Sequence, residues 1–295
     1  RMVLPLNSRE YKLELRNLNM APQSFSNSIS SMKIVPVGAF QVLVVVGDSR
    51  TNEPAILEAL TDIEGHKFDY HTVHINSNPD NYGNPDNAVK LSSVLLSEYD
   101  IVWFTWNAPA HDGQYLVEDA EEDIKNFVQK GGVVWASAMD DNIVPPDGVH
   151  THESSWKGNW LPVDQYPIKV VSSSDINVNI TKDGKRTGLF TWPNKVDVNA
   201  LITDDHWVTD DPAYTKLAIR RDNQDAVGIQ LGWGDGYYVG FSIDTRDTSK
   251  ATLAKTLIEN ALCYLANLAW QSSPRQPLKG RYRLSKGSDW RKSHF

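Results

Sequence analysis

The sequence predicts an α/β fold built on a doubly wound, mainly parallel sheet with added antiparallel strands. Three short apolar runs, at residues 41–46, 100–106 and 133–137, carry branched and aromatic residues at successive positions. That pattern is typical of strands buried on both faces of a parallel sheet. Residues 116–128 repeat apolar side chains at three- and four-residue spacing, which predicts an amphipathic helix between the last two runs.

The helix is expected to end at Gly131 and Gly132, because glycine tolerates the left-handed conformation of a helix C-terminus. Together with its two flanking runs it forms a right-handed βαβ unit. We expect further elements in this order: a helix from about Pro54, a strand at 68–75, a helix at 87–97, short strands at 168–171 and 177–180, a meander at 217–221, 226–232 and 237–243, and a last helix opened by residues 247–249.

The two ends of the chain do not follow this alternation. Residues 11–16 and 32–37 alternate like exposed strands, which predicts a strand-rich N-terminal extension at 1–40. Residues 271–295 are basic and turn-rich, which indicates a C-terminal extension or linker. The α/β domain itself should span residues 41–270.

Composition and charge exclude several classes of partner. A net charge of -8 argues against nucleic acid as a partner. No apolar run approaches the roughly 20 residues of a membrane span, so we expect no membrane partner. The single cysteine, Cys263, excludes an internal disulfide and a cysteine-based zinc cluster. Compartment and oligomeric state are not determined by these properties.

Polar residues follow several of the predicted strands, and parallel strands deliver the loops that follow them to one edge of a sheet. The candidates for a site at this carboxyl edge are Asp48, Asn107, His111, Ser137, Asp140, Asp141, Asp244 and Arg246. Asp140 and Asp141 could hold a hard cation or act as a base, and Arg246 could bind a carboxylate. The alternative is that these Asp and Asn residues cap helices and form turns.

Two more specific chemistries are open at this edge. Ser137 could act as a nucleophile with His111 as its base, although the G-x-S-x-G motif is absent and a serine at a strand end is often structural. His150, His152 and Glu153 offer the residue types of a metal site, as does His206 beside two aspartates. No cofactor is expected, and a divalent metal is the open alternative.

Tryptophans are concentrated near the expected site. Trp106, Trp156, Trp160, Trp207 and Trp233 lie in predicted loops or at strand ends, and aromatic faces beside carboxylates suit carbohydrate binding. The irregular stretch at 143–165 follows the strand that ends at Ser137, and with Asp205, His206 and Trp207 it should form the wall of the pocket. The alternative to a binding role is that these tryptophans hold a long loop in place through packing.

Four segments resemble a known superfamily. Residues 99–104 with Gly131-Gly132, residues 179–189, residues 203–207, and residues 236–242 with 259–266 are similar in order and pattern to class I glutamine-amidotransferase-like proteins. They are most similar to the trehalose-utilisation (ThuA-like) branch. The resemblance covers roughly residues 41–269 and implies a flavodoxin-like α/β fold.

The chain departs from this family where amidotransferase chemistry takes place. Ser137 stands near the turn where amidotransferases carry the nucleophilic cysteine, and the family's histidines near that turn and after the last strand are Ser137 and Thr245 here. We therefore expect a domain without glutaminase activity that binds a carbohydrate or similar polar small molecule. The alternatives are a hydrolase or sugar-modifying enzyme using Asp and His at the strand edge, with or without a metal, and a non-catalytic interaction module of a larger protein.

Overall fold

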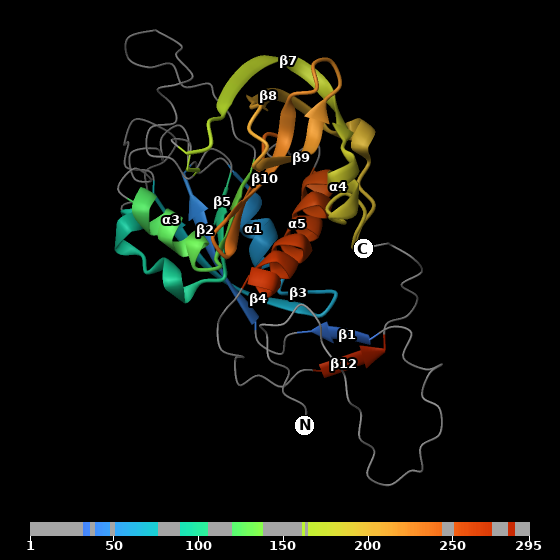
Figure 1. The fold of residues 1–295 in the computed structure, drawn as a ribbon. Helices are drawn as coiled ribbons and strands as arrows, with labels where there is room; N and C mark the ends of the chain where they lie inside the picture. The colour runs from blue at the N-terminus through green and yellow to red at the C-terminus, as the bar shows by residue number, and fades with distance from the viewer. Residues whose placement is uncertain are drawn as a thin grey trace, which may run out of the picture.

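The computed structural model describes residues 32–35, 39–47, 51–75, 89–105, 120–137, 161–162, 165–243, 251–272 and 283–286. Its main feature is a ten-stranded mixed sheet in the order β3-β4-β2-β5-β6-β11-β10-β8-β7-β9 (Figure 1). The strands are β2 (Ala39–Val46), β3 (Asp62–Ile63), β4 (His66–His74), β5 (Ile101–Phe104), β6 (Val133–Ala136), β7 (Lys169–Ile180), β8 (Ile202–Val208), β9 (Tyr214–Arg220), β10 (Ala226–Trp233) and β11 (Gly236–Phe241). The sequence-based prediction of an α/β protein with a mixed sheet is confirmed.

Five neighbouring strands, β4, β2, β5, β6 and β11, run parallel to one another. Every side chain of β5 and β6 is buried, as their uninterrupted apolar sequences predict. In the register of β5 and β6, Phe104 pairs with Ala136, so Thr105 and Ser137 follow side by side at the carboxyl edge.

The antiparallel part continues the sheet beyond β11. The strands β9, β10 and β11 form the predicted meander, but the two short strands expected at 168–180 are one long strand, β7. Irregular pairing between Ser172 and Ile176 lets the first half of β7 pair with β8 and its last residues pair with β9. Because β9 also pairs with β10, the strands β7, β8, β10 and β9 are joined in a closed ring of pairings. In Figure 1, β7 arches over the other three strands.

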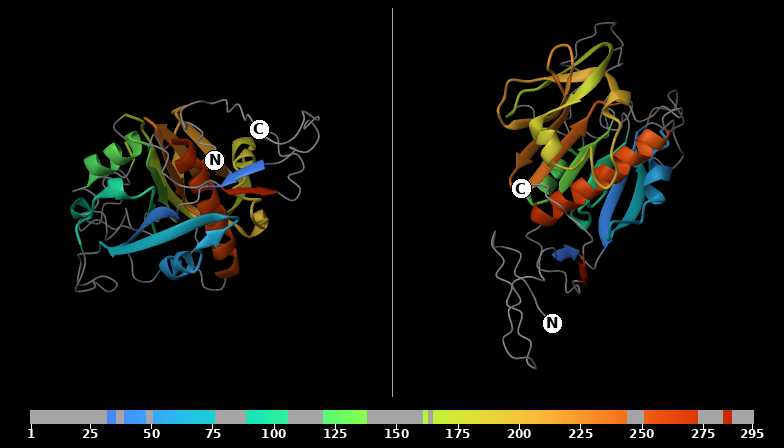
Figure 2. Two further views of the ribbon diagram at one scale, coloured as in Figure 1. Left: turned by 90° about the horizontal axis from the view of Figure 1, so that it is seen from below. Right: turned by 90° about the vertical axis from the view of Figure 1, so that its right-hand side faces the viewer.

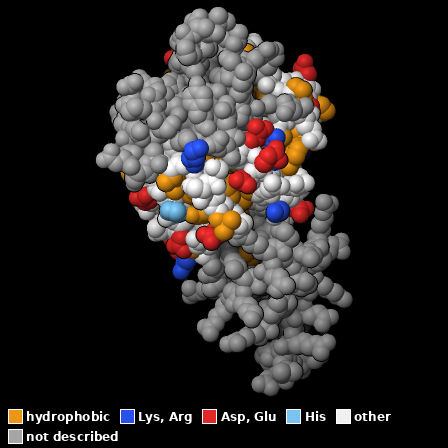
Figure 3. All heavy atoms as spheres, turned by 90° about the vertical axis from the view of Figure 1, so that its left-hand side faces the viewer, with side chains coloured by type: hydrophobic (Ala, Val, Ile, Leu, Met, Phe, Trp, Pro, Cys, Tyr) orange, Lys and Arg blue, Asp and Glu red, His pale blue; other side chains and the backbone are white. Residues whose placement is uncertain are grey.

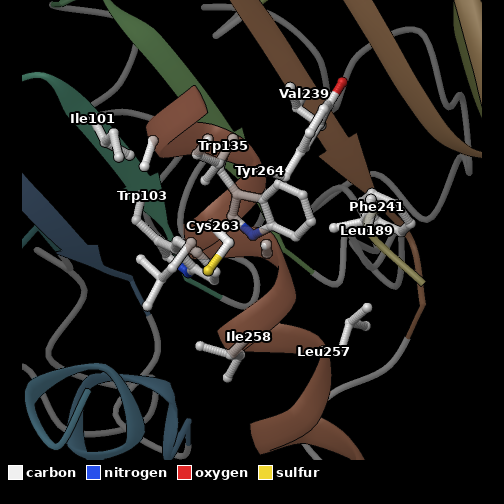
Figure 4. Close-up of a cluster of buried hydrophobic side chains, with 14 of the residues drawn as sticks. Ile101, Trp103, Trp135, Leu189, Val239, Phe241, Leu257, Ile258, Cys263 and Tyr264 are labelled. Carbon is white, nitrogen blue, oxygen red and sulfur yellow. The ribbon is translucent and has the colours of Figure 1, made fainter. Parts of the chain in front are cut away.

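Helices cover both faces of the parallel strands (Figure 2). On one face α1 (Glu53–Glu58) and α5 (Ala251–Ser272) bury Leu57, Leu257 and Ile258 against Trp103 and Trp135. Figure 4 shows this cluster, with Cys263 of α5 close to Trp103. On the other face lie α3 (Glu121–Gln129) and two 3₁₀ turns, η2 (Leu91–Ser93) and η3 (Leu96–Glu98).

The end of α3 follows the prediction closely. Gly131 has a φ of 100°, its N–H donates to Val128 O, and the N–H of Gly132 donates to Phe127 O. These two bonds are the Schellman pattern that satisfies the last carbonyl groups of a helix. A Cβ at Gly132 would also lie 2.3 Å from the Phe127 ring, so this glycine permits close packing.

The second predicted helix is wrong for the described residues 89–100, which form η2 and η3. The reason is local: Ser93 Oγ donates to the backbone oxygen of Lys90 at 2.6 Å, and such bonds compete with an α-helical ladder.

The remaining described elements are small. Helix α4 (Lys182–Arg186) follows β7, and a 3₁₀ turn, η5 (Val198–Ala200), precedes β8. In a separate two-stranded sheet, β1 (Met32–Val35) pairs antiparallel with β12 (Arg283–Lys286). The strand expected at 32–37 therefore takes its partner from the C-terminal extension, while residues 11–16 lie outside the described residues. None of the described helices is long and apolar enough to cross a membrane.

Candidate site at the carboxyl edge of the parallel strands

A serine and a glutamate meet at the carboxyl edge. Ser137 directly follows β6, where its N–H donates to Phe104 O at 3.0 Å and extends the sheet pairing by one residue. Its Oγ donates a short hydrogen bond to Oε1 of Glu53. Both residues are buried, with exposed fractions of 2% for Ser137 and 0% for Glu53.

Glu53 reaches this position because it is the first residue of α1, on the segment that follows β2. Thr51 holds it from the other side: its Oγ1 donates to Glu53 Oε2 at 3.3 Å and accepts from the Glu53 N–H at 3.2 Å. The carboxylate is thus bonded at each of its oxygens. Sequence reasoning missed Glu53, which looked like an ordinary acidic residue in a first helical turn; its place after the first buried strand was the available signal.

The neighbouring hydroxyl group serves the sheet. Thr105 follows β5, is fully buried, and both its N–H and its Oγ1 donate to Val45 O at 3.1 Å. It therefore ties the end of β5 to β2 and leaves the Ser137–Glu53 pair as the distinctive polar feature among the described residues of this edge.

Most of the other predicted site residues lie outside the described residues, so the structure does not place them. They are Asp48, Trp106, Asn107, His111, Asp140, Asp141, Trp156, Trp160, Asp244 and Arg246. His150, His152 and Glu153 belong to the same group. Among the residues that are described, no group of three or more His, Cys, Asp or Glu side chains could hold a metal ion.

Asp205, His206 and Trp207 do not form a loop wall, and this part of the prediction is wrong. They belong to β8 and are buried, and His206 Nε2 lies 3.3 Å from Asp225 Oδ2. The Trp207 indole is fully buried in the apolar cluster beside α3 and offers no face to a sugar. In the sheet, β11 and β10 separate β8 from β6, the strand before Ser137.

A polar network that is buried except at Asp222 joins the antiparallel strands instead. Arg220 of β9 donates to both carboxylate oxygens of Asp222, at 3.0 and 2.9 Å, and to Thr203 O at 3.4 Å. Thr203 Oγ1 in turn lies 3.1 Å from Ser242 Oγ, just beyond β11. The hydrogen bonds and charge of Arg220 hold the pKa of Asp222 below its ordinary value. Because its groups bind one another across three strands, we interpret this network as holding the fold.

Three residues of the family-like segments also have structural roles. Asp100 Oδ2 accepts from the N–H of Gln41 at 3.0 Å, and Thr181 caps α4 by accepting from the N–H of Gly184 at 2.9 Å. Asn260 of α5 is fully buried and bonds the 189–194 segment through three hydrogen bonds. These three residues of the resemblance therefore contribute to the fold.

A cavity of about 580 Å³ lies at the opposite, amino edge of the parallel strands. The loops before β5 and β6 form its floor, with Tyr99, Asp100 and Gly132 among the lining residues, and η2, η3 and α3 form its sides. Leu95, also in the lining, is 63% exposed. Figure 3 shows the side of the molecule that lies at the left in Figure 1, where apolar side chains lie among acidic and basic ones on the described part.

Comparison with known proteins gives structural likeness only. No protein-family model and no curated protein matches the chain. A presumed GMP synthase component from Thermoplasma acidophilum is 10% identical, with a TM-score of 0.45 over 78% of this chain and 96% of that chain. PurLQS from Thermotoga maritima is 11% identical, with a TM-score of 0.42 over 77% and 100%. A presumed ThuA-like protein from Parabacteroides merdae is 11% identical, with a TM-score of 0.41 over 78% and 91%.

Proposed function

We propose that this chain is a ThuA-like, glutamine-amidotransferase-like domain that binds a carbohydrate or similar polar small molecule at the carboxyl edge, without glutaminase chemistry. The proposal includes a doubly wound, flavodoxin-like fold. Numbered along the chain, the parallel strands β4-β2-β5-β6-β11 stand in the order 2-1-3-4-5, which is the flavodoxin-like order. In such sheets ligands bind outside the carboxyl ends of the strands.

The observation that carries the proposal is the buried Glu53–Ser137 pair. Burying a carboxylate costs several kcal/mol unless hydrogen bonds compensate it. A carboxylate that is buried at a binding edge despite this cost is therefore a candidate for a functional role. The Glu53 carboxylate accepts hydrogen bonds and donates none. A ligand hydroxyl group is the complementary donor.

The cysteine chemistry of an amidotransferase has no counterpart in the described residues. Cys263 is fully buried in α5 within the apolar cluster of Figure 4, as its position on the helix's apolar stripe predicts. A thiol in such surroundings is unreactive.

The test is a calorimetric titration of the full chain with a panel of mono- and disaccharides and with glutamine. We expect a sugar to bind and glutamine to remain intact. Glu53→Gln should weaken sugar binding at least about tenfold, because a hydrogen bond to a charged group contributes roughly 1.5–3 kcal/mol. Ser272→Ala is the matched control, since this buried serine bonds Leu268 O at the far end of α5.

Two results would count against the proposal. Equal binding by wild type, Glu53→Gln and Ser137→Ala would place the site elsewhere on the molecule. Absence of sugar binding by the wild-type chain would favour the interaction-module alternative.

A further inference from the structure

We propose that Ser137 is the nucleophile of an acyl-transfer site, that Glu53 is its proton acceptor, and that the substrate is an O-acyl ester of a hydroxyl-rich molecule. The identity of the alcohol part rests on the proposed carbohydrate site, whereas the reactivity of the serine does not. The base differs from the one that the sequence suggests: it is a carboxylate on α1, 84 residues from the serine, and not His111.

The acceptor of its hydroxyl proton sets Ser137 apart from the other buried serine and threonine residues. The other five buried serine and threonine residues of the described chain donate to backbone carbonyl oxygens: Thr105 to Val45, Thr203 to Asp205, Thr209 to Pro167, Ser242 to Val227 and Ser272 to Leu268. A carbonyl oxygen does not take up a proton at neutral pH, whereas a carboxylate does. Among the buried serine and threonine residues of the described chain, Ser137 is the one whose hydroxyl group bonds a side chain that can act as a base.

The surroundings of the pair fix its geometry before a substrate arrives. Ser137 is held by its N–H bond to Phe104 at the end of a fully buried strand. Glu53 is held by Thr51 through its second oxygen and its N–H. A nucleophile and base that are each held by a third group form the arrangement that covalent catalysis requires.

The reaction balances with water as the only co-reactant. Ser137 Oγ bonds to the acyl carbon while its proton passes to Glu53, and the bond between the acyl carbon and the alcohol oxygen breaks. The leaving alcohol takes the proton from Glu53. Water then attacks the acyl-serine, gives a proton to Glu53, and releases the carboxylic acid as that proton returns to Ser137 Oγ.

The experiment is labelling of the full chain with diisopropyl fluorophosphate, which a reactive serine attacks with loss of fluoride. Intact mass and peptide mapping should show one adduct per chain, located on Ser137. Ser137→Ala should abolish the adduct, and Glu53→Gln should slow labelling about 100-fold, the lower range of a general-base contribution. Ser272→Ala should be labelled like wild type, and circular dichroism would confirm that each variant is folded.

Several outcomes would overturn the inference: no adduct on the folded wild-type chain, an adduct on another serine, or labelling of Glu53→Gln at the wild-type rate. Peptide mapping of the wild-type chain decides the first two even if a variant fails to fold. An adduct on Ser137 in a chain that binds no sugar would defeat only the proposed carbohydrate function. Sugar binding without an adduct would defeat only the acyl-transfer inference.

Discussion

Asn260→Ala should destabilise the fold far more than an ordinary surface substitution. Asn260 is fully buried on α5, and its side chain makes three hydrogen bonds to backbone groups. Its Oδ1 accepts from the N–H of Asn194 at 2.9 Å, and its Nδ2 donates to Leu189 O at 2.9 Å and to Asn194 O at 2.7 Å. The amide therefore replaces the backbone pairing that this irregular segment lacks.

The magnitude follows from the groups left without partners. Each buried polar group that loses its hydrogen bond costs about 1–3 kcal/mol. Asn194 is only half-buried, so water can compensate part of its loss, while Leu189 is fully buried. We expect the free energy of unfolding to fall by about 3 kcal/mol.

The assay is urea unfolding followed by circular dichroism, with Asn126→Ala as the matched control. Asn126 is an exposed residue of α3, so the same substitution there should change stability by less than about 0.5 kcal/mol. A loss in Asn260→Ala no larger than that of the control would refute the reasoning that α5 holds the 189–194 segment through this amide.

Three further predictions concern packing, charge and the thiol. Gly184→Ala should destabilise the chain by about 2 kcal/mol, because its Cβ would lie 1.9 Å from a backbone oxygen of β9; Gly232→Ala, with its nearest contact at 3.7 Å, should not. Since Arg220 lowers the pKa of Asp222 in the folded state, the stabilisation by this pair is present above the ordinary aspartate pKa and lost as the pH falls through the lowered one. The stability difference between wild type and Asp222→Asn should therefore shrink on acidification below about pH 4, and a constant difference would contradict this. Cys263 should react with a thiol reagent only as fast as the chain unfolds, and ammonia release from glutamine that Cys263→Ala abolishes would oppose that expectation.

Periodicity predicted the parallel strands well because their environment is uniform. A strand buried on both faces must be apolar at every position, so β5 and β6 could be recognised from four residues each. The end of α3 was equally predictable, because Gly131 adopts a conformation that few other residues tolerate.

Prediction failed where tertiary contacts override local pattern. Residues 89–97 contain enough apolar positions for a helix, but the Ser93 side chain bonds the nearby backbone, and two 3₁₀ turns form here. The β8 segment combines aspartates, a histidine and a tryptophan, a composition that is typical of a loop. His206 instead lies 3.3 Å from Asp225, which precedes β10, and this pairing cannot be seen along one strand.

The candidate site was predictable in part. The carboxyl edge and Ser137 follow from the order of strands, since each parallel strand places its next residue there. Glu53 was missed, because its contact with Ser137 joins two residues that are 84 positions apart in the sequence. Asp100, Thr181 and Asn260 show that several residues of the family-like segments serve folding.

The most direct test of the account is to locate a bound sugar by the changes it causes in the amide NMR signals of the deuterated chain. A ligand at one edge of the parallel strands would shift different amide signals from a ligand at the other edge. Binding at the carboxyl edge should shift the signals of Gly47, Glu53, Thr105 and Ser137. Shifts confined to the amino-edge cavity around Asp100 would contradict the account, because they would place the ligand at the opposite end of the same strands.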